Sequence, residues 1–327
     1  MSIYVSISCL GFDSELENTI QSCISTAEKP EDIFIGVSMV GKKDFYNEMV
    51  TKFNNENIKF KFDSFEDGVN VGKGRVLAAS MYNDQDYFLQ TDAHVMFTQG
   101  WDKYLIDRFL NGQKIVNNQK IVLTGTLPPY VRVSGIPTLR DESVLVTKYV
   151  PNVYMVNSRA IPGWVGMHTS ELSEKVKKYI DETGFAPEPK ITAMFIFGNK
   201  YFANELCIDE SFIFWEEEPL QSLELINNGF TIMYPGPYPV LYHMYNSDSI
   251  DGEYYRDGLD EITKQLNFSK TSYYFKIENN YNSFIYNKDN KEKRKRYEDY
   301  IKFNMGIGTK NIGEYPDNYA NIGFLPV

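Results

Sequence analysis

Asp92 and His94 are the residues whose types and spacing best suit chemistry. They follow residues 87–91, Tyr-Phe-Leu-Gln-Thr, a run typical of a buried strand. Side chains two positions apart on an extended chain point to the same side, so this carboxylate and imidazole lie next to each other. Such a pair supplies half of the ligands of a divalent metal site. A turn that ends in a hydrogen-bonded histidine is the plainer interpretation of the same residues.

Histidine is scarce in this chain, which narrows the search for a further metal ligand. The sequence has three histidines, at positions 94, 168 and 243. His243 follows the apolar residues 240–242 and is the stronger candidate, although a buried core histidine would have the same pattern. His168 follows a glycine-containing stretch at 163–167 and is its rival as a ligand.

Glu217 and Glu218 form a second candidate cluster, at the start of a helix expected to end at Gly229. Carboxylates are favoured in the first turn of any helix by the helix dipole. These glutamates also follow the aromatic-rich residues 212–215, which should be buried. Burying a carboxylate in such surroundings costs solvation free energy unless a polar partner compensates. This cost favours contact of the glutamates with a ligand.

Gly68, Gly72 and Gly74 form a glycine-rich stretch before a helix expected to begin at Arg75. Their spacing is not that of a Walker loop or a dinucleotide fingerprint. Backbone amides at a helix start, together with the planar guanidinium of Arg75, still offer a site to an anionic ligand. An ordinary glycine turn fits these residues equally well.

Strands and helices alternate through the first 110 residues. Alternating or apolar runs predict strands at 3–9, 32–40, 58–65 and 87–91, and helices at 14–26, 42–53, 75–82 and 100–110. Ser14 and Glu17 have the spacing of a capping box for the first helix. This order predicts an α/β fold with a doubly wound, mostly parallel sheet, whose ligands bind at the carboxyl ends of the strands. Further strands are expected at 120–126, 192–197 and 230–233, and a charged helix at 288–303.

Composition limits the classes of partner. The net charge of −11 disfavours broad binding to nucleic acid. Cys9, Cys23 and Cys207 are few and widely separated, which indicates reduced thiols of a cytoplasmic protein. The N-terminus does not resemble a signal peptide, and no apolar run reaches the roughly 20 residues that span a membrane. We therefore expect no membrane partner.

Several segments together resemble glycosyltransferases of the GT-A fold. Residues 89–94, followed by Gly100 and Trp101, are similar to the Gln-x-Asp-x-His segment of glycosyltransferase family 60. That family includes cytoplasmic enzymes that add N-acetylglucosamine to hydroxyproline. The segment is also similar to the Asp-x-His segment of the polypeptide N-acetylgalactosaminyltransferases. The segments 6–16, 195–198, 217–218 and 243–245 match in order and spacing, so the resemblance covers residues 3–245. Phe12 departs from it, because family members often carry arginine there.

The resemblance implies a GT-A (Rossmann-like) domain over residues 1–245, with a nucleotide-binding half at 1–110 and a sugar and acceptor half at 111–245. Residues 246–327 would form a closing loop and a C-terminal helical segment packed on the same domain. A divalent ion, Mn²⁺ or Mg²⁺, would be held by Asp92, His94 and His243. A UDP-sugar would be bound by Ser8, Gly72, Gly74, Arg75 and Asp92. Glu217 and Glu218 would be the catalytic residues that meet the sugar or the acceptor.

The function implied is retaining transfer of N-acetylglucosamine, or another hexose or pentose, from a UDP-sugar to a hydroxyl group. A protein acceptor is favoured. Hydroxymethylated bases in phage DNA are the second choice, because the basic run at 288–296 could contact phosphates. A nucleotide- or glycan-binding pseudoenzyme is a further alternative. A nucleotidyltransferase would share the sheet and the metal, and would release pyrophosphate rather than UDP.

Overall fold

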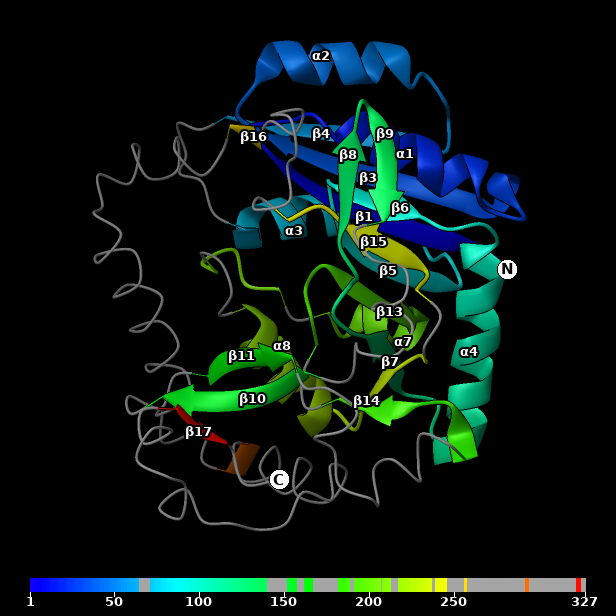
Figure 1. The fold of residues 1–327 in the computed structure, drawn as a ribbon, viewed down its shortest axis with the longest axis vertical. Coiled ribbons are helices and arrows are strands. Elements are labelled where there is room, and N and C mark those ends of the chain that lie inside the picture. The colour runs from blue at the N-terminus through cyan, green and yellow to red at the C-terminus, as the bar shows by residue number, and fades with distance from the viewer. Residues whose placement is uncertain are drawn as a thin grey trace.

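Eight strands form the central sheet of the structure, which is a computed structural model (Figure 1). In spatial order they are β12 (Ala186–Pro187), β14 (Thr231–Tyr234), β7 (Ile121–Thr124), β13 (Phe195–Asn199), β5 (Tyr87–Asp92), β1 (Ile3–Leu10), β3 (Ile33–Val40) and β4 (Ile58–Asp63). The structure describes residues 1–64, 71–139, 152–157, 162–166, 182–188, 191–206, 208–212, 217–236, 239–245, 256–257, 292–293 and 322–324.

Most strand pairs in this sheet are parallel. Strands β4, β3, β1 and β5 run in one direction, and β14 pairs parallel with β7. Strand β13 is antiparallel to both of its neighbours, and β12 is antiparallel to β14 at the edge. The mostly parallel α/β sheet expected from the sequence is confirmed.

The strand order reverses between β1 and β5. The chain adds β3 and β4 on one side of β1 and then returns to place β5 on the other side. In open α/β sheets, ligands bind at the carboxyl ends of the strands at such a switch point. Asp92 is the last residue of β5 and pairs with Ser8 of β1 in register, so both residues lie at this edge. The topology therefore places the candidate site where this fold class binds ligands.

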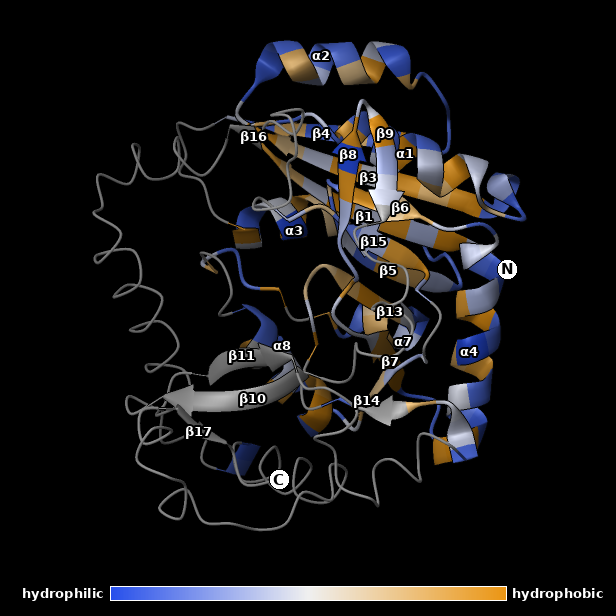
Figure 2. Cartoon of the chain, in the orientation of Figure 1, coloured by the Kyte–Doolittle hydropathy of each residue, from blue (hydrophilic) through white to orange (hydrophobic). Residues whose placement is uncertain are grey.

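Helices cover both faces of the sheet. Helices α1 (Leu16–Ser25), α2 (Lys43–Lys52) and α4 (Trp101–Val116) pack on the face that carries Ile3, Val5 and Ile7. Helices α3 (Val71–Ala79), α7 (Lys200–Asn204) and α8 (Glu217–Asn227) lie on the opposite face with Tyr4. Figure 2 shows apolar residues along the sheet strands and a mixture of polar and apolar residues on α2 and α4, as expected for helices with one buried face.

Among the described residues, short strands outside the central sheet form four small sheets. Strand β6 (Val95–Phe97) pairs with β15 (Leu241–His243), β8 (Tyr130–Val133) with β9 (Ile136–Leu139), β2 (Phe12–Asp13) with β16 (Arg256–Asp257), and β10 (Asn152–Asn157) with both β11 (Pro162–Gly166) and β17 (Ile322–Phe324). The first of these joins segments almost 150 residues apart and completes the candidate site.

Helix α3 begins earlier than the sequence predicts, at Val71 rather than at Arg75. Gly72 and Gly74 therefore lie inside the helix and not in the loop before it. A Cβ atom on Gly72 would be 2.1 Å from the carbonyl oxygen of Asp209, and one on Gly74 would be 2.4 Å from the Oγ atom of Ser8. The glycines allow α3 to pack closely against its neighbours, a requirement that the helix pattern alone does not reveal.

The capping box expected at Ser14 and Glu17 is wrong. The N-cap of α1 is Glu15, whose side chain makes no capping hydrogen bond. Glu17 instead forms an ion pair with Lys52 of α2, with an Nζ–Oε2 distance of 2.5 Å. The carboxylate of Asp13 accepts a hydrogen bond from the Glu15 backbone N–H, so the turn before α1 is stabilised from the N-terminal side.

Three expectations lie wholly or largely outside the described residues. They are the role of His168, the closing loop that follows residue 245, and the charged helix at 288–303. The division into a domain at 1–245 and a tail at 246–327 stays a prediction. Among the described helices, none combines the length and the apolar character required for crossing a membrane.

Candidate active site

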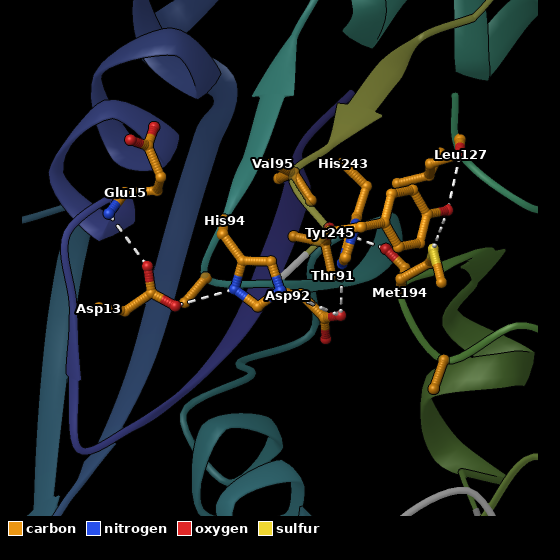
Figure 3. A network of polar contacts seen from close by, with 12 residues as sticks. Asp13, Glu15, Thr91, Asp92, His94, Val95, Leu127, Met194, His243 and Tyr245 are labelled. Carbon is orange, nitrogen blue, oxygen red and sulfur yellow. Dashed lines mark hydrogen bonds and ion pairs between the residues drawn. The ribbon is translucent and has the colours of Figure 1, made fainter. Parts of the chain in front are cut away.

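The two histidines come together through a short antiparallel ribbon. Strand β6 follows His94 directly, and β15 ends at His243, with Val95 and His243 paired in register. The backbone N–H of Met244 donates to the carbonyl oxygen of His94 at 3.0 Å. The imidazole rings lie with centroids 4.6 Å apart (Figure 3). The ribbon thus places two buried imidazoles at the carboxyl end of β5.

Asp92, His94 and His243 could hold one metal ion between them. Each offers one ligand atom, and these atoms lie within 4.8 Å of one another. The Asp92 Oδ2 atom is 3.2 Å from Nε2 of His243 and 4.0 Å from Nε2 of His94. Bonds of about 2.1 Å to a hard cation place ligand atoms about 3 Å apart when adjacent and about 4.2 Å apart when opposite. The donor set and its spacing therefore fit a divalent cation.

Arg75 of α3 holds the carboxylate of Asp92. Its Nη2 atom donates to Asp92 Oδ1 at 2.6 Å, and its Nη1 atom donates to the carbonyl oxygen of Thr91 at 2.9 Å. Burial by itself raises the pKa of Asp92, but the Arg75 guanidinium and the hydrogen bond from His243 outweigh it and hold this pKa well below its ordinary value. Asp92 is thus an anion in the folded protein, as a metal ligand requires.

Glu217 lies near the Nε atom of the same guanidinium. It is the first residue of α8, and its Oε1 atom is 3.8 Å from Nε of Arg75, with both side chains buried. Burial lowers the pKa of Arg75, while the nearby charges of Asp92 and Glu217 raise it, and the result is a pKa above the ordinary value. The positively charged Arg75 therefore lies close both to Glu217, predicted to be catalytic, and to Asp92, predicted to bind the metal.

Glu218 has a different environment from Glu217. Its Oε1 atom accepts a hydrogen bond from the backbone N–H of Ala193 at 2.8 Å, just before β13. The carbonyl oxygen of Ala193 in turn accepts from the side-chain amide of Gln90 on β5. The two adjacent glutamates predicted as catalytic therefore contact different neighbours, and Glu218 fixes a segment of backbone.

The predicted nucleotide-binding residues lie near this centre. Ser8 is opposite Asp92 in the sheet, and its hydroxyl faces Gly74 on α3. Gly72 packs against the backbone of residues 209–212 and donates its N–H to the carbonyl oxygen of Phe212. Packing accounts for both glycines, and their contact with a nucleotide stays a prediction.

Asp13 is a neighbour of the site to which the sequence reasoning gave no role, and Tyr245, from the segment 243–245 of the resemblance, also lies beside it. The Oδ2 atom of Asp13 lies 2.8 Å from Nδ1 of His94. The Tyr245 ring lies 4.3 Å from the ring of His243, and its hydroxyl donates to the carbonyl oxygen of Leu127. The sequence did offer one signal for Asp13. It follows the first predicted strand, whose neighbour in the sheet ends at Asp92.

Comparison with known proteins identifies the class. The mixed sheet has a GT-A-like fold: a crystal structure described as GalNAc-T7 with UDP, GalNAc and Mn²⁺ matches with a TM-score of 0.56 at 15% sequence identity, over 92% of this chain and 54% of that one. The chain thus spans about half the length of that protein. TarS of S. aureus, residues 1–349, matches with a TM-score of 0.46 at 12% identity, over 93% of this chain and 81% of that one.

A family model described as "Glycosyltransferase (GlcNAc)" matches residues 47–324. The chain belongs to that family of glycosyltransferases. A search of curated proteins finds no match. The resemblance inferred from the sequence motifs is confirmed.

Replacing Arg75 with Lys tests the ion pair at the centre of the site. Lysine keeps the charge but removes the planar fork that holds both the Thr91 carbonyl and Asp92. We expect Arg75→Lys to lower the free energy of unfolding by about 1–3 kcal/mol. We also expect it to weaken binding of a divalent cation several-fold, because Asp92 is held less firmly. Urea unfolding and titration with Mn²⁺ as the probe ion measure the two effects.

Arg108→Lys is the matched control. Arg108 also uses two guanidinium nitrogens, donating to the backbone oxygens of Pro235 and Gly184, away from the three candidate ligands. It should lose a similar amount of stability without a change in cation binding. Equal weakening of cation binding in both variants would show that Arg75 acts through general stability alone.

Proposed function

We propose that this protein is a metal-dependent glycosyltransferase that moves a sugar from a UDP-sugar to a hydroxyl group. The observation that carries the proposal is the cluster of Asp92, His94 and His243 at the switch point of the sheet. Carboxylate and imidazole ligands suit Mn²⁺ or Mg²⁺. The structural neighbour with UDP and Mn²⁺ supports the same assignment.

The donor would bind across the carboxyl ends of β1 and β5. When bound, the metal ion would supply Lewis-acid neutralisation of the departing diphosphate. Ser8, Gly72 and Gly74 would line the nucleotide pocket. Arg75 keeps Asp92 ionised and oriented toward this edge, which prepares the metal ligand before the donor arrives.

Glu217 and Glu218 would contact the sugar or the acceptor hydroxyl. Charge-assisted hydrogen bonds from hydroxyl groups to a carboxylate would orient the reacting sugar. Glu218 also accepts from the backbone of Ala193 through Oε1, so Glu217 is the stronger candidate of the two for direct contact.

The acceptor would be a hydroxyl group on a protein. The acidic net charge of −11 and the family resemblance favour it over DNA. Within the basic run at 288–296, the described Lys293 forms an ion pair with Glu224 of α8, with Nζ–Oε distances of 2.7 and 2.9 Å. That lysine is thus used within the protein, which weakens the case for a DNA-binding strip. The resemblance also favours a cytoplasmic enzyme.

His243→Ala tests the ligand set. Removing the imidazole should abolish Mn²⁺-dependent release of UDP from the preferred donor and weaken Mn²⁺ binding at least 10-fold. A panel of UDP-sugars with Mn²⁺ identifies the donor, and electron paramagnetic resonance of free Mn²⁺ measures the binding. His168→Ala is the control and should bind Mn²⁺ as the natural protein does. The reverse result would assign the ligand role to His168.

Retention of the anomeric configuration is the second expectation. The resemblance to retaining families leads us to expect an α-linked product from an α-linked donor. The anomeric coupling constant of the glycoside product, measured by NMR, distinguishes the outcomes. A β-linked product would mean that transfer inverts the sugar.

Glu217→Gln tests the contact with substrate. The amide keeps the shape of the side chain and removes its charge, so transition-state interactions should suffer more than donor binding. We expect kcat to fall by at least 10-fold while the Kd of the donor changes less than threefold. Glu218→Gln is the comparison, because its amide oxygen can still accept from Ala193. An equal loss of donor affinity and kcat in Glu217→Gln would make Glu217 a donor-binding residue instead.

A further inference from the structure

Asp13 is a buried carboxylate whose two oxygens are both engaged. Its exposed fraction is 2%. One oxygen accepts from the Glu15 backbone N–H at 3.0 Å, and the other lies 2.8 Å from Nδ1 of His94. In Figure 3, Asp13 and Asp92 lie on opposite sides of the His94 ring. The carboxylate is thus held in one orientation against the ring edge that faces away from Asp92.

The contact decides which nitrogen of His94 carries the proton. An ionised carboxylate only accepts hydrogen bonds, so the neutral ring donates from Nδ1. The lone pair is then on Nε2, the nitrogen that lies 4.0 Å from Asp92 Oδ2. Metal-binding histidines commonly have this arrangement, with the second ring nitrogen donating to a carboxylate.

Glu15 continues the network on the other side of the turn. Its exposed fraction is 1%, and Arg132 of β8 holds it in a fork, with Nε–Oε1 at 2.5 Å and Nη2–Oε2 at 2.9 Å. The Tyr130 hydroxyl donates to the same carboxylate at 3.0 Å. Burial, and then the Glu15 charge, raise the pKa of Tyr130, so its hydroxyl remains a donor.

The strand held by Glu15 leads directly to His243. Pro129, next to Tyr130, forms a β-bridge with His243, and the His243 backbone N–H donates to the carbonyl oxygen of Pro128 at 2.9 Å. The contacts therefore run from His94 through Asp13 and Glu15 to β8 and on to His243. Both candidate histidine ligands are attached to the same turn before α1.

We infer that Asp13 is a positioning residue of the metal centre, which sets the proton of His94 on Nδ1, and that Glu15 couples this turn to the strand beside His243. This inference rests on the proposed function, since it assigns a role toward the metal. Its central statement concerns the metal-free protein and is tested there.

Asp13→Asn gives a sharp test. The Asn oxygen would keep the bond from the Glu15 N–H, and its NH₂ group would then face Nδ1 of His94. That nitrogen must become an acceptor, which moves the proton to Nε2. With only three histidines in the chain, long-range ¹H–¹⁵N spectra of the metal-free protein can resolve His94. Recorded at about pH 8, where an unperturbed imidazole is neutral, they report the tautomer.

The expected results are a proton on Nδ1 in the natural protein and on Nε2 in Asp13→Asn. The variant should also bind Mn²⁺ 10- to 100-fold more weakly, the usual effect of losing such a carboxylate partner. Glu15→Gln should weaken Mn²⁺ binding less and leave the proton of His94 on Nδ1, because it changes only the coupling to β8.

Asp102→Asn is the matched control, because Asp102 is also a buried carboxylate and accepts from the backbone N–H groups of Glu28 and Lys29. It should lower the melting temperature without changing the His94 tautomer or Mn²⁺ binding. A proton on Nε2 of His94 in the metal-free natural protein would overturn the inference, even if Asp13→Asn does not fold. So would equal effects of Asp13→Asn and Asp102→Asn on Mn²⁺ binding. Failure of the natural protein to bind Mn²⁺ would instead contradict the proposed function, while the tautomer would still decide the role of Asp13.

Discussion

The ion pair between Arg75 and Asp92 is the interaction on which the candidate site depends. A buried guanidinium is costly unless carboxylates accompany it, and here Asp92 and Glu217 both lie close to it. Among the described residues at the centre, three carboxylates (Asp13, Asp92 and Glu217) accompany this one guanidinium. Carboxylates thus gather around the candidate ligands at this edge of the sheet, and such a grouping attracts cations.

The sheet topology explains why these groups meet. Parallel strands bring their carboxyl ends to one edge, and the reversal between β1 and β5 leaves that edge open between two connections that diverge. Asp92 ends β5, and the turn with Asp13 follows β1. Helix α3 crosses from β4 to β5 on the opposite face from α1, so Arg75 approaches Asp92 from one side while Asp13 approaches His94 from the other. The Tyr4 hydroxyl, bonded to the carbonyl oxygen of Ala78, helps to fix α3 on the sheet.

The sequence predicts those features that local pattern controls. Alternating or largely apolar runs located β1, β3 and β5, and the spacing of Asp92 and His94 placed both side chains together. The scarcity of histidine pointed to His243, although no local pattern shows that β15 pairs with β6. The role of Asp13 depends on a turn in which Glu15, not Ser14, is the N-cap. The early start of α3 depends on how closely Gly72 approaches Asp209. The Asp13–His94 and Gly72–Asp209 contacts join residues that are distant in sequence, and hydrophobic periodicity does not show such contacts.

The buried pair of Glu15 and Arg132 is better explained by geometry than by stability. Apolar side chains of similar volume often stabilise a fold as well as a buried ion pair does. A bidentate fork, however, fixes two planar groups relative to each other, and the Tyr130 hydroxyl restricts the carboxylate further. The strand so fixed, β8, begins beside the backbone of His243. A charged pair that contributes little net stability is thus well suited to hold two histidines, distant in sequence, at a fixed spacing.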